Sequence, residues 1–194
     1  MDLFRCYYKA MGKDIPYVIK DTKIIYENPW IKLREDTIIR KNGQKGIYSY
    51  LVVNESVCVI AVNKSGRICI VESYRQPFKK WFWELPGGGG DGQSVTKAAK
   101  RELLEEACIK ASKWTTLGKA RVCNGLSTEY QHNILATILE YDDHFVQKED
   151  ETRARRFVSL QELDAMISLG EFEDNQSIVA LYMYKNWLSA LNNS

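Results

Sequence analysis

Three glutamates at short spacing are the residues of this sequence best placed to do chemistry. Glu102, Glu105 and Glu106 lie inside the segment 94–107, whose pattern predicts a helix. Successive helical side chains rotate by about 100°, so the three carboxylates share one face within roughly 100° of arc. Hard oxygen ligands suit Mg²⁺, which completes its octahedron with waters and phosphate oxygens. The cluster is a candidate magnesium site; the alternative is a solvated face paired with lysines and Arg101.

A glycine run leads into this helix. Residues 87–92 read Gly-Gly-Gly-Gly-Asp-Gly, which predicts a break in regular structure. Backbone N–H groups and the helix dipole favour anions at a helix N-terminus, so a phosphate could approach closely there. Ala99, Leu103 and Ala107 occupy the arc beside the glutamates and are expected to pack on a sheet. The acidic stripe would then lie at the rim of the core.

The order of glycines, helix and glutamates resembles the Nudix box. That box reads Gly, five residues, Glu, seven residues, Arg-Glu, two residues, Glu-Glu, one residue, Gly and an aliphatic residue. The spacing is kept here at Gly87, Gln93, Arg101, Glu102, Glu105, Glu106, Cys108 and Ile109. Upstream, Tyr74-Arg75-Gln76 and Glu84-Leu85-Pro86 look like the approach to the box in ADP-ribose and nucleotide-sugar pyrophosphatases.

The resemblance implies a fold and a division of the chain. The expected class is α/β (α+β mixed), a Nudix-like α/β/α sandwich around a mixed sheet with an N-terminal antiparallel β subdomain. Residues 1–55 would form the β-rich subdomain and residues 56–194 the catalytic domain. Relatives of this kind pair through the N-terminal sheet, so a homodimer is expected by analogy.

The resemblance also implies roles within the box. Glu102, Glu105 and Glu106 would hold Mg²⁺, with Mn²⁺ as an alternative ion, and a carbonyl at Gly87 or Gly88 would add a ligand. Arg101 would orient the glutamates. The ion would neutralise the diphosphate and activate or position the attacking water.

Each candidate residue outside the box has two interpretations, one functional and one structural. The general base comes from the box or from a late acidic loop, where Glu151 is favoured over a merely solvated carboxylate. Trp30 would stack on the nucleobase or else lie in the core. Arg75, together with Gly88, would bind the diphosphate, or Arg75 is a surface arginine.

Two positions depart from the pattern. Gln93 lacks the charge of the usual Glu, which weakens any metal site or partnership with Arg101 that depends on it. Cys108 replaces the Gly that ends the helix with positive φ, a conformation that costs other residues about 1 kcal/mol or more. We therefore expect the helix to end differently here.

The surrounding elements can be predicted in outline. The first third is mostly antiparallel sheet with a hairpin at Asn42-Gly43. Residues 57–63 and 68–74 are apolar almost throughout and should be central strands buried on both faces. A capping box at Ser159 starts a helix that ends near Gly170, and a last helix covers about 177–191. Its expected apolar face consists of Ile178, Leu181, Tyr182, Leu188 and Leu191.

Composition excludes several functional classes. The 27 basic and 25 acidic residues nearly cancel without a basic block, so no long nucleic acid is expected as a partner. The apolar runs are too short to cross a membrane, and no secretion signal is recognised. Five widely spaced cysteines fit a reducing cytoplasm, with Cys58 and Cys69 in the core.

The expected partner is a small nucleoside diphosphate derivative, and three functions remain open. The first is Mg²⁺-dependent hydrolysis of ADP-ribose or a related nucleotide sugar to a nucleoside monophosphate and a sugar phosphate. The second is Nudix hydrolysis of a dinucleoside polyphosphate, a coenzyme or a damaged nucleotide. The third, motivated by Gln93 and Cys108, is non-catalytic nucleotide sensing.

Overall fold

The structure, a computed structural model, describes residues 15–141 and 151–192. Two compact units are formed by Met1–Val53 with Cys123–Thr128 (unit 1) and by Asn54–Val122 with Glu129–Ser194 (unit 2). The strands are β1 (Tyr17–Glu27), β2 (Ile31–Arg40), β3 (Lys45–Val53), β4 (Ser56–Ala61), β5 (Ile68–Arg75), β6 (Lys80–Glu84), β7 (Gly87–Gly89), β8 (Lys110–Arg121), β9 (Tyr130–Glu140) and β10 (Thr152–Val158). The helices are α2 (Val95–Ala107), α3 (Leu160–Ser168) and α4 (Asn175–Asn192).

Unit 1 is a three-stranded antiparallel sheet in the order β1-β2-β3. The predicted hairpin is confirmed, because Gly43 has a φ of 83° between β2 and β3 and Asn42 Oδ1 accepts the Gln44 N–H at 3.1 Å. Strand β1 was not predicted. Several large apolar side chains of this sheet are exposed: Ile19, Ile24, Ile25, Tyr26 and Ile47.

Unit 2 contains two sheets. One has the order β10-β5-β6, and the other has the order β7-β4-β9-β8, in which β4 and β9 run parallel. Strands β4 and β5 are interior strands, as their apolar sequences predicted. Strands β8 and β10 were not predicted.

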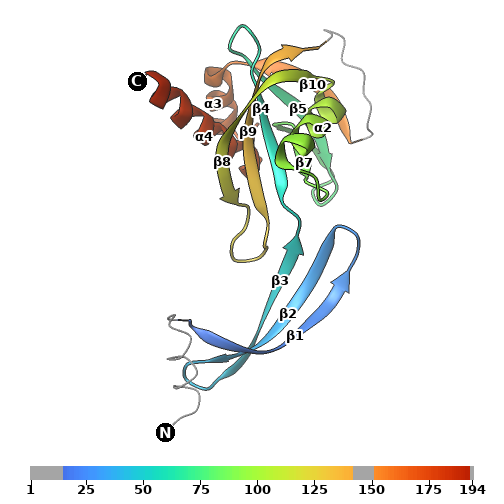
Figure 1. Cartoon of the computed structure of the whole chain (residues 1–194), viewed down its shortest axis with the longest axis vertical. Coiled ribbons are helices and arrows are strands. Elements are labelled where there is room, and N and C mark those ends of the chain that lie inside the picture. Colours follow the sequence, from blue (N-terminus) through green and yellow to red (C-terminus); the bar gives the residue numbers. More distant parts are fainter. Residues whose placement is uncertain (1–14, 142–150, 193–194) are drawn as a thin grey trace. The chain divides into compact units, whose positions relative to one another are not determined.

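Alternate residues of β4 and β5 point into two separate cores. Val57, Val59 and Val71 belong to a cluster with Ala98, Ala99 and Leu103 of α2. Cys58, Ile60 and Ile70 belong to a second cluster with residues of α3 and α4. In Figure 1, α2 accordingly lies on one side of these sheets, and α3 and α4 lie on the other. The predicted α/β/α sandwich is confirmed, with Cys58 and Cys69 in its core.

The helix ends follow local sequence signals, with two corrections. The capping box is confirmed: Ser159 and Glu162 satisfy each other's backbone N–H groups. Helix α2 ends at Cys108 with φ 53° and ψ 37°, so the expected different ending is wrong, and Cys108 adopts the conformation usual for Gly. The expected apolar face of α4 is partly wrong, because Tyr182 and Leu191 are exposed. Its buried residues are Ser177, Ala180, Leu181 and Tyr184.

A helix that crosses a membrane must be both long and apolar. Among residues 15–141 and 151–192, no helix combines the length and apolar character needed to cross a bilayer.

Candidate active site

The glycine run is packed against protein atoms. Residues Gly87–Gly89 form β7, paired antiparallel with β4, so the expected break in regular structure is wrong for these three residues. A Cβ at Gly87 would lie 2.4 Å from the carbonyl oxygen of Val57, and one at Gly88 would lie 2.6 Å from Oε1 of Glu102. Glycine is therefore required at Gly87, where the clash is with backbone, whereas a Cβ at Gly88 would displace the Glu102 carboxylate from its position.

Glu106 lies directly against β7. Its Oε2 accepts a hydrogen bond from the Gly87 N–H at 2.7 Å. Burial raises the pKa of Glu106 to about 8; the Gly87 hydrogen bond opposes this shift, and the charges of Glu102 and Glu84 add to it. A buried carboxyl of this kind holds its proton more tightly than usual, and a nearby cation would stabilise its anion.

The other two box glutamates share Arg101. The Arg101 guanidinium lies 2.7 Å from Oε1 of Glu102 and 2.8 Å from Oε2 of Glu105. Glu102 is 7% exposed, and burial raises its pKa, with Arg101 opposing the shift. The structure therefore places Glu102 and Glu105 on Arg101, and it places Glu102 and Glu106 against the glycine strand.

Arg75 lies at the end of β5, beside β6. Its Nε donates to Oε2 of Glu84 at 3.0 Å, and a terminal nitrogen donates to Oε1, so the pair is bidentate. Glu84 is 3% exposed; burial raises its pKa, although Arg75 opposes the shift. Arg75 also lowers the pKa of Glu106. Arg75 is itself exposed, as expected of a surface arginine, and it also neutralises a buried carboxylate close to the box.

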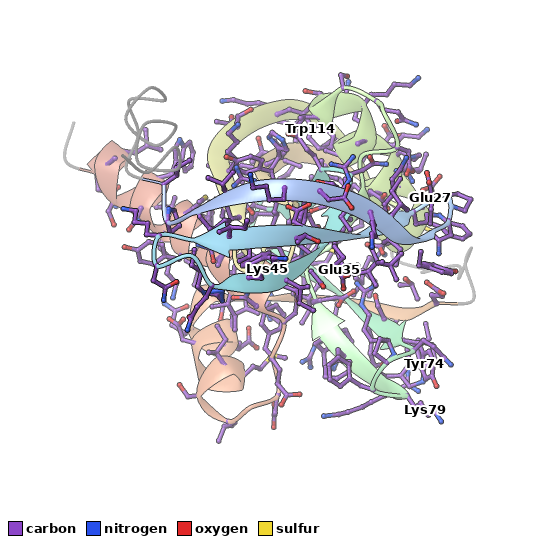
Figure 2. The ribbon with its side chains drawn as sticks, turned by 90° about the horizontal axis from the view of Figure 1, so that it is seen from below. Glu27, Glu35, Lys45, Tyr74, Lys79 and Trp114 are labelled. Atoms are coloured by element: carbon purple, nitrogen blue, oxygen red, sulfur yellow. The ribbon has the colours of Figure 1, made fainter. Side chains whose placement is uncertain are left out.

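A cavity of about 650 Å³ opens beside this ion pair. Arg75, Phe78, Phe82, Glu84, Glu173 and Asp174 are among its lining residues. Tyr74 and Lys79, labelled in Figure 2, mark the end of the hairpin formed by β5 and β6. This hairpin contributes Arg75, Phe78, Phe82 and Glu84 to the lining of the cavity. The cavity has the size and the mixed aromatic and polar lining that suit a small ligand.

Two family models match the chain, one to each part of the sequence. The model described as NUDIX domain matches residues 53–180, which is more than half of the chain. The chain belongs to the NUDIX family. The model described as nucleoside diphosphate sugar hydrolase N-terminal domain matches residues 19–51.

Individual proteins resemble this NUDIX chain over different lengths. An ADP-ribose pyrophosphatase of Mycobacterium tuberculosis is 35% identical over 109 residues, 54% of this chain and 52% of that protein, so the match spans about half of that relative. A methanol dehydrogenase activator of Bacillus methanolicus is 28% identical over 154 residues, 79% of this chain and 81% of the activator. The crystal structure of an ADP compounds hydrolase has a TM-score of 0.79 at 19% identity, covering 93% of this chain and 98% of that one, which shows the shared fold.

NUDIX hydrolases generally need a divalent metal ion, and the donor set here fits one. Across the described residues, no three Asp, Glu, His or Cys side chains are already gathered as a metal cluster. The available donors are nevertheless hard oxygens, and the desolvated Glu106 carboxylate accepts a hydrogen bond from the backbone N–H of Gly87. These residues suit a small divalent cation of the magnesium type.

The remaining predicted residues lie outside the box. Glu151 is exposed at the start of β10, and its backbone carbonyl accepts the Tyr74 N–H at 2.7 Å; the rest of the late acidic loop falls outside the described residues. Trp30 lies in unit 1 between β1 and β2 and is 72% exposed, so its interpretation as a core residue is wrong. Its backbone N–H donates to Asn28 Oδ1 at 2.9 Å.

Two acidic residues that contact Arg75 or Arg101 were not among the site residues predicted from the sequence. Glu84 was recognised only as part of the approach to the box, because its contact with Arg75 joins two neighbouring strands. Asp91 was treated as part of the glycine run, yet its carboxylate lies 3.0 Å from Arg101. Nothing in the sequence indicates that contact, because it depends on the backbone conformation of the loop.

Proposed function

We propose that this chain is a divalent-metal-dependent pyrophosphohydrolase that cleaves the diphosphate bond of ADP-ribose or a related nucleotide sugar. The desolvated carboxylate of Glu106 beside the glycine strand is the observation that carries the proposal. The printed activity of the Mycobacterium tuberculosis relative and the description of the N-terminal family model support a nucleotide sugar as the substrate. The products would be a nucleoside monophosphate and a sugar phosphate.

Different residues of the box would bind the metal ion and position its ligands. Glu102, Glu105 and Glu106 would hold the ion, proposed to be Mg²⁺, with the carbonyl of Gly87 or Gly88 nearby. When bound, the ion would neutralise diphosphate oxygens and activate or position water. Arg101 would keep the carboxylates of Glu102 and Glu105 in place through the ion pairs that it already makes.

Three further residues are proposed to act on the substrate. Arg75 would direct its remaining N–H groups to the diphosphate, since Glu84 holds the guanidinium through only two of its nitrogens. Glu151 would serve as general base, and its exposure leaves it accessible to water. Trp30 would stack on the nucleobase with its exposed ring.

A substrate panel tests the proposed function. The protein is incubated with Mg²⁺ and ADP-ribose, other nucleotide sugars, dinucleoside polyphosphates and coenzymes, and the products are separated chromatographically. We expect cleavage of a nucleotide sugar at its diphosphate bond. Binding by calorimetry without turnover of any compound would instead favour the nucleotide-sensing alternative. Turnover confined to another compound class would reject the nucleotide sugar.

We also propose that the protein forms a homodimer through unit 1. The exposed isoleucines on its three-stranded sheet support this, because burial of such side chains is worth about 1.5–3 kcal/mol each. Light scattering should give twice the mass of one chain. A strict monomer at all concentrations would reject the dimer.

A further inference from the structure

Arg101 is held from two sides. From α2, it contacts the carboxylates of Glu102 and Glu105 at 2.7 and 2.8 Å. From the preceding loop, the Gly89 carbonyl oxygen accepts from its NH2 group at 2.7 Å, and Oδ2 of Asp91 accepts from the same group at 3.0 Å. Asp91 is therefore the carboxylate that holds this guanidinium from outside the helix.

The side chain at position 93 does not hold the Arg101 guanidinium. The family pattern has Glu there, whereas this chain has Gln93, whose side-chain oxygen is buried without a hydrogen-bond partner in the described part of the chain. Nε of Arg101 is also buried without a partner there. A buried polar atom left unpaired is unfavourable. The side chain of Gln93 therefore provides no acceptor for Arg101.

The backbone of the loop brings Asp91 to Arg101. Asp91 has a φ of 47°, in the left-handed region that few residues other than Gly adopt. Asp and Asn are among the side chains that tolerate this region best. The Gln93 N–H donates to the Gly90 carbonyl at 2.8 Å and closes a turn around Asp91. The local fold thus maintains an uncommon conformation at the residue whose carboxylate meets Arg101.

We infer that Asp91 is a positioning residue that holds Arg101 in this chain, where position 93 carries no carboxylate that could do so. The inference rests on the proposed function. Arg101 carries one positive charge, and Asp91 draws part of its hydrogen bonding away from the glutamates. Without the hydrogen bond to Asp91, the guanidinium pairs more completely with Glu102 and Glu105. These carboxylates then become poorer ligands for a cation.

The expected effect is moderate. Asp91 is 55% exposed at its side chain and Arg101 is 27% exposed, so solvent screens the pair. Exposed ion pairs of this kind correspond to a factor of about two to five in an equilibrium constant. Asp91→Asn should therefore weaken Mn²⁺ binding about two- to fivefold. Asn tolerates the left-handed conformation as well, so the backbone should not change.

The test uses the full chain, three variants of the loop and one control variant. Mn²⁺ binding is titrated by electron paramagnetic resonance for the wild type, Asp91→Asn, Gln93→Glu and the double variant. Asp164→Asn is the matched control, since Asp164 also makes an ion pair at the surface, with Lys185, away from the box. We expect weaker binding for Asp91→Asn, recovery in the double variant and no change for Asp164→Asn. A merely structural role would lower the thermal midpoint without recovery by Gln93→Glu.

A second readout needs no metal. The side-chain Nε–H signal of Arg101 in proton–nitrogen NMR spectra of the metal-free protein should shift with Asp91→Asn and not with Asp164→Asn. An unchanged Arg101 signal, or Mn²⁺ binding that the double variant does not recover, overturns the inference about Asp91. Absence of turnover with every substrate would reject the proposed function alone, because neither readout involves substrate.

Discussion

Glu84 and Glu106 are two shielded carboxylates in neighbouring parts of unit 2, and their surroundings differ. Burial raises the pKa of both. Glu84 at the end of β6 has a bidentate arginine, Arg75, as its partner. Glu106 on α2 has the Gly87 N–H. The first site is complete as an ion pair, whereas the second is deficient in positive charge and is suited to bind a cation.

Removing the carboxylate that lacks a cation should have the largest effect. Glu106→Gln keeps the shape of the side chain and should lower turnover at least about a hundredfold, as loss of a metal ligand or a general base does. Steady-state kinetics with the best substrate of the panel measure this. Glu171→Gln, an exposed position on the surface, is the matched control. Full turnover by Glu106→Gln would contradict the role of this residue.

The pH dependence of stability tests the raised pKa of Glu106. The folded pKa of Glu106 is about 8 against an ordinary value of 4.5, so the folded state binds the extra proton between these pH values. Stability is therefore highest below about pH 4.5 for this group and is lost as the pH rises through about 8, by roughly 1.4 kcal/mol per pH unit. Urea unfolding of metal-free protein at pH 6 and pH 8 should show this loss. Glu106→Gln should remove the slope, and a slope that persists in this variant would assign it to another group.

Gly87 and Gly88 of β7 lie beside the box glutamates, and replacing either one with alanine tests how closely β7 packs there. Gly87→Ala places Cβ 2.4 Å from a backbone oxygen of Val57, which cannot move away easily, and should destabilise the fold by about 2 kcal/mol. Gly88→Ala meets the carboxylate end of the Glu102 side chain, which can rotate away, whereas the backbone of Val57 cannot. It should leave thermal stability nearly unchanged while weakening Mn²⁺ binding. Equal thermal midpoints for the two variants would contradict this distinction.

Removing the cation from the complete pair should have the smallest effect. Arg75→Leu leaves Glu84 buried without its partner, a change that costs about 3–5 kcal/mol at fully buried pairs. Arg75 is 45% exposed at its side chain, so solvent reduces the expected loss to about 1–2 kcal/mol. Chemical denaturation measures it. The double variant with Glu84→Gln should recover part of the stability, and no recovery would mean that the pair does not act as a unit.

Much of the fold follows from sequence patterns because it depends on local chemistry. Strands β4 and β5 are apolar on both faces since each lies between two helical layers. The capping box of α3 is visible in four consecutive residues. Strands β8 and β1 were missed because their side chains are largely half-buried or exposed, so neither shows a clear apolar run.

The sequence predicted only those parts of the site in which the spacing of residues along one helix determines which side chains lie together. The carboxylates of α2 share a face by helical geometry, and the structure retains that arrangement. The contacts of Arg101 with Asp91 and of Arg75 with Glu84 join residues through a left-handed turn and a strand pairing. These depend on tertiary structure, which no local pattern in the sequence encodes.

The pKa of Glu106 is the most direct test of a carboxylate prepared for a divalent cation. It can be measured by carbon-13 NMR titration of the labelled side chain, first in metal-free protein and then with saturating Mg²⁺. We expect a value of about 8 without metal and a clear decrease when the ion is added. An ordinary value near 4.5 in the metal-free protein, or a pKa that Mg²⁺ does not change, would contradict the account.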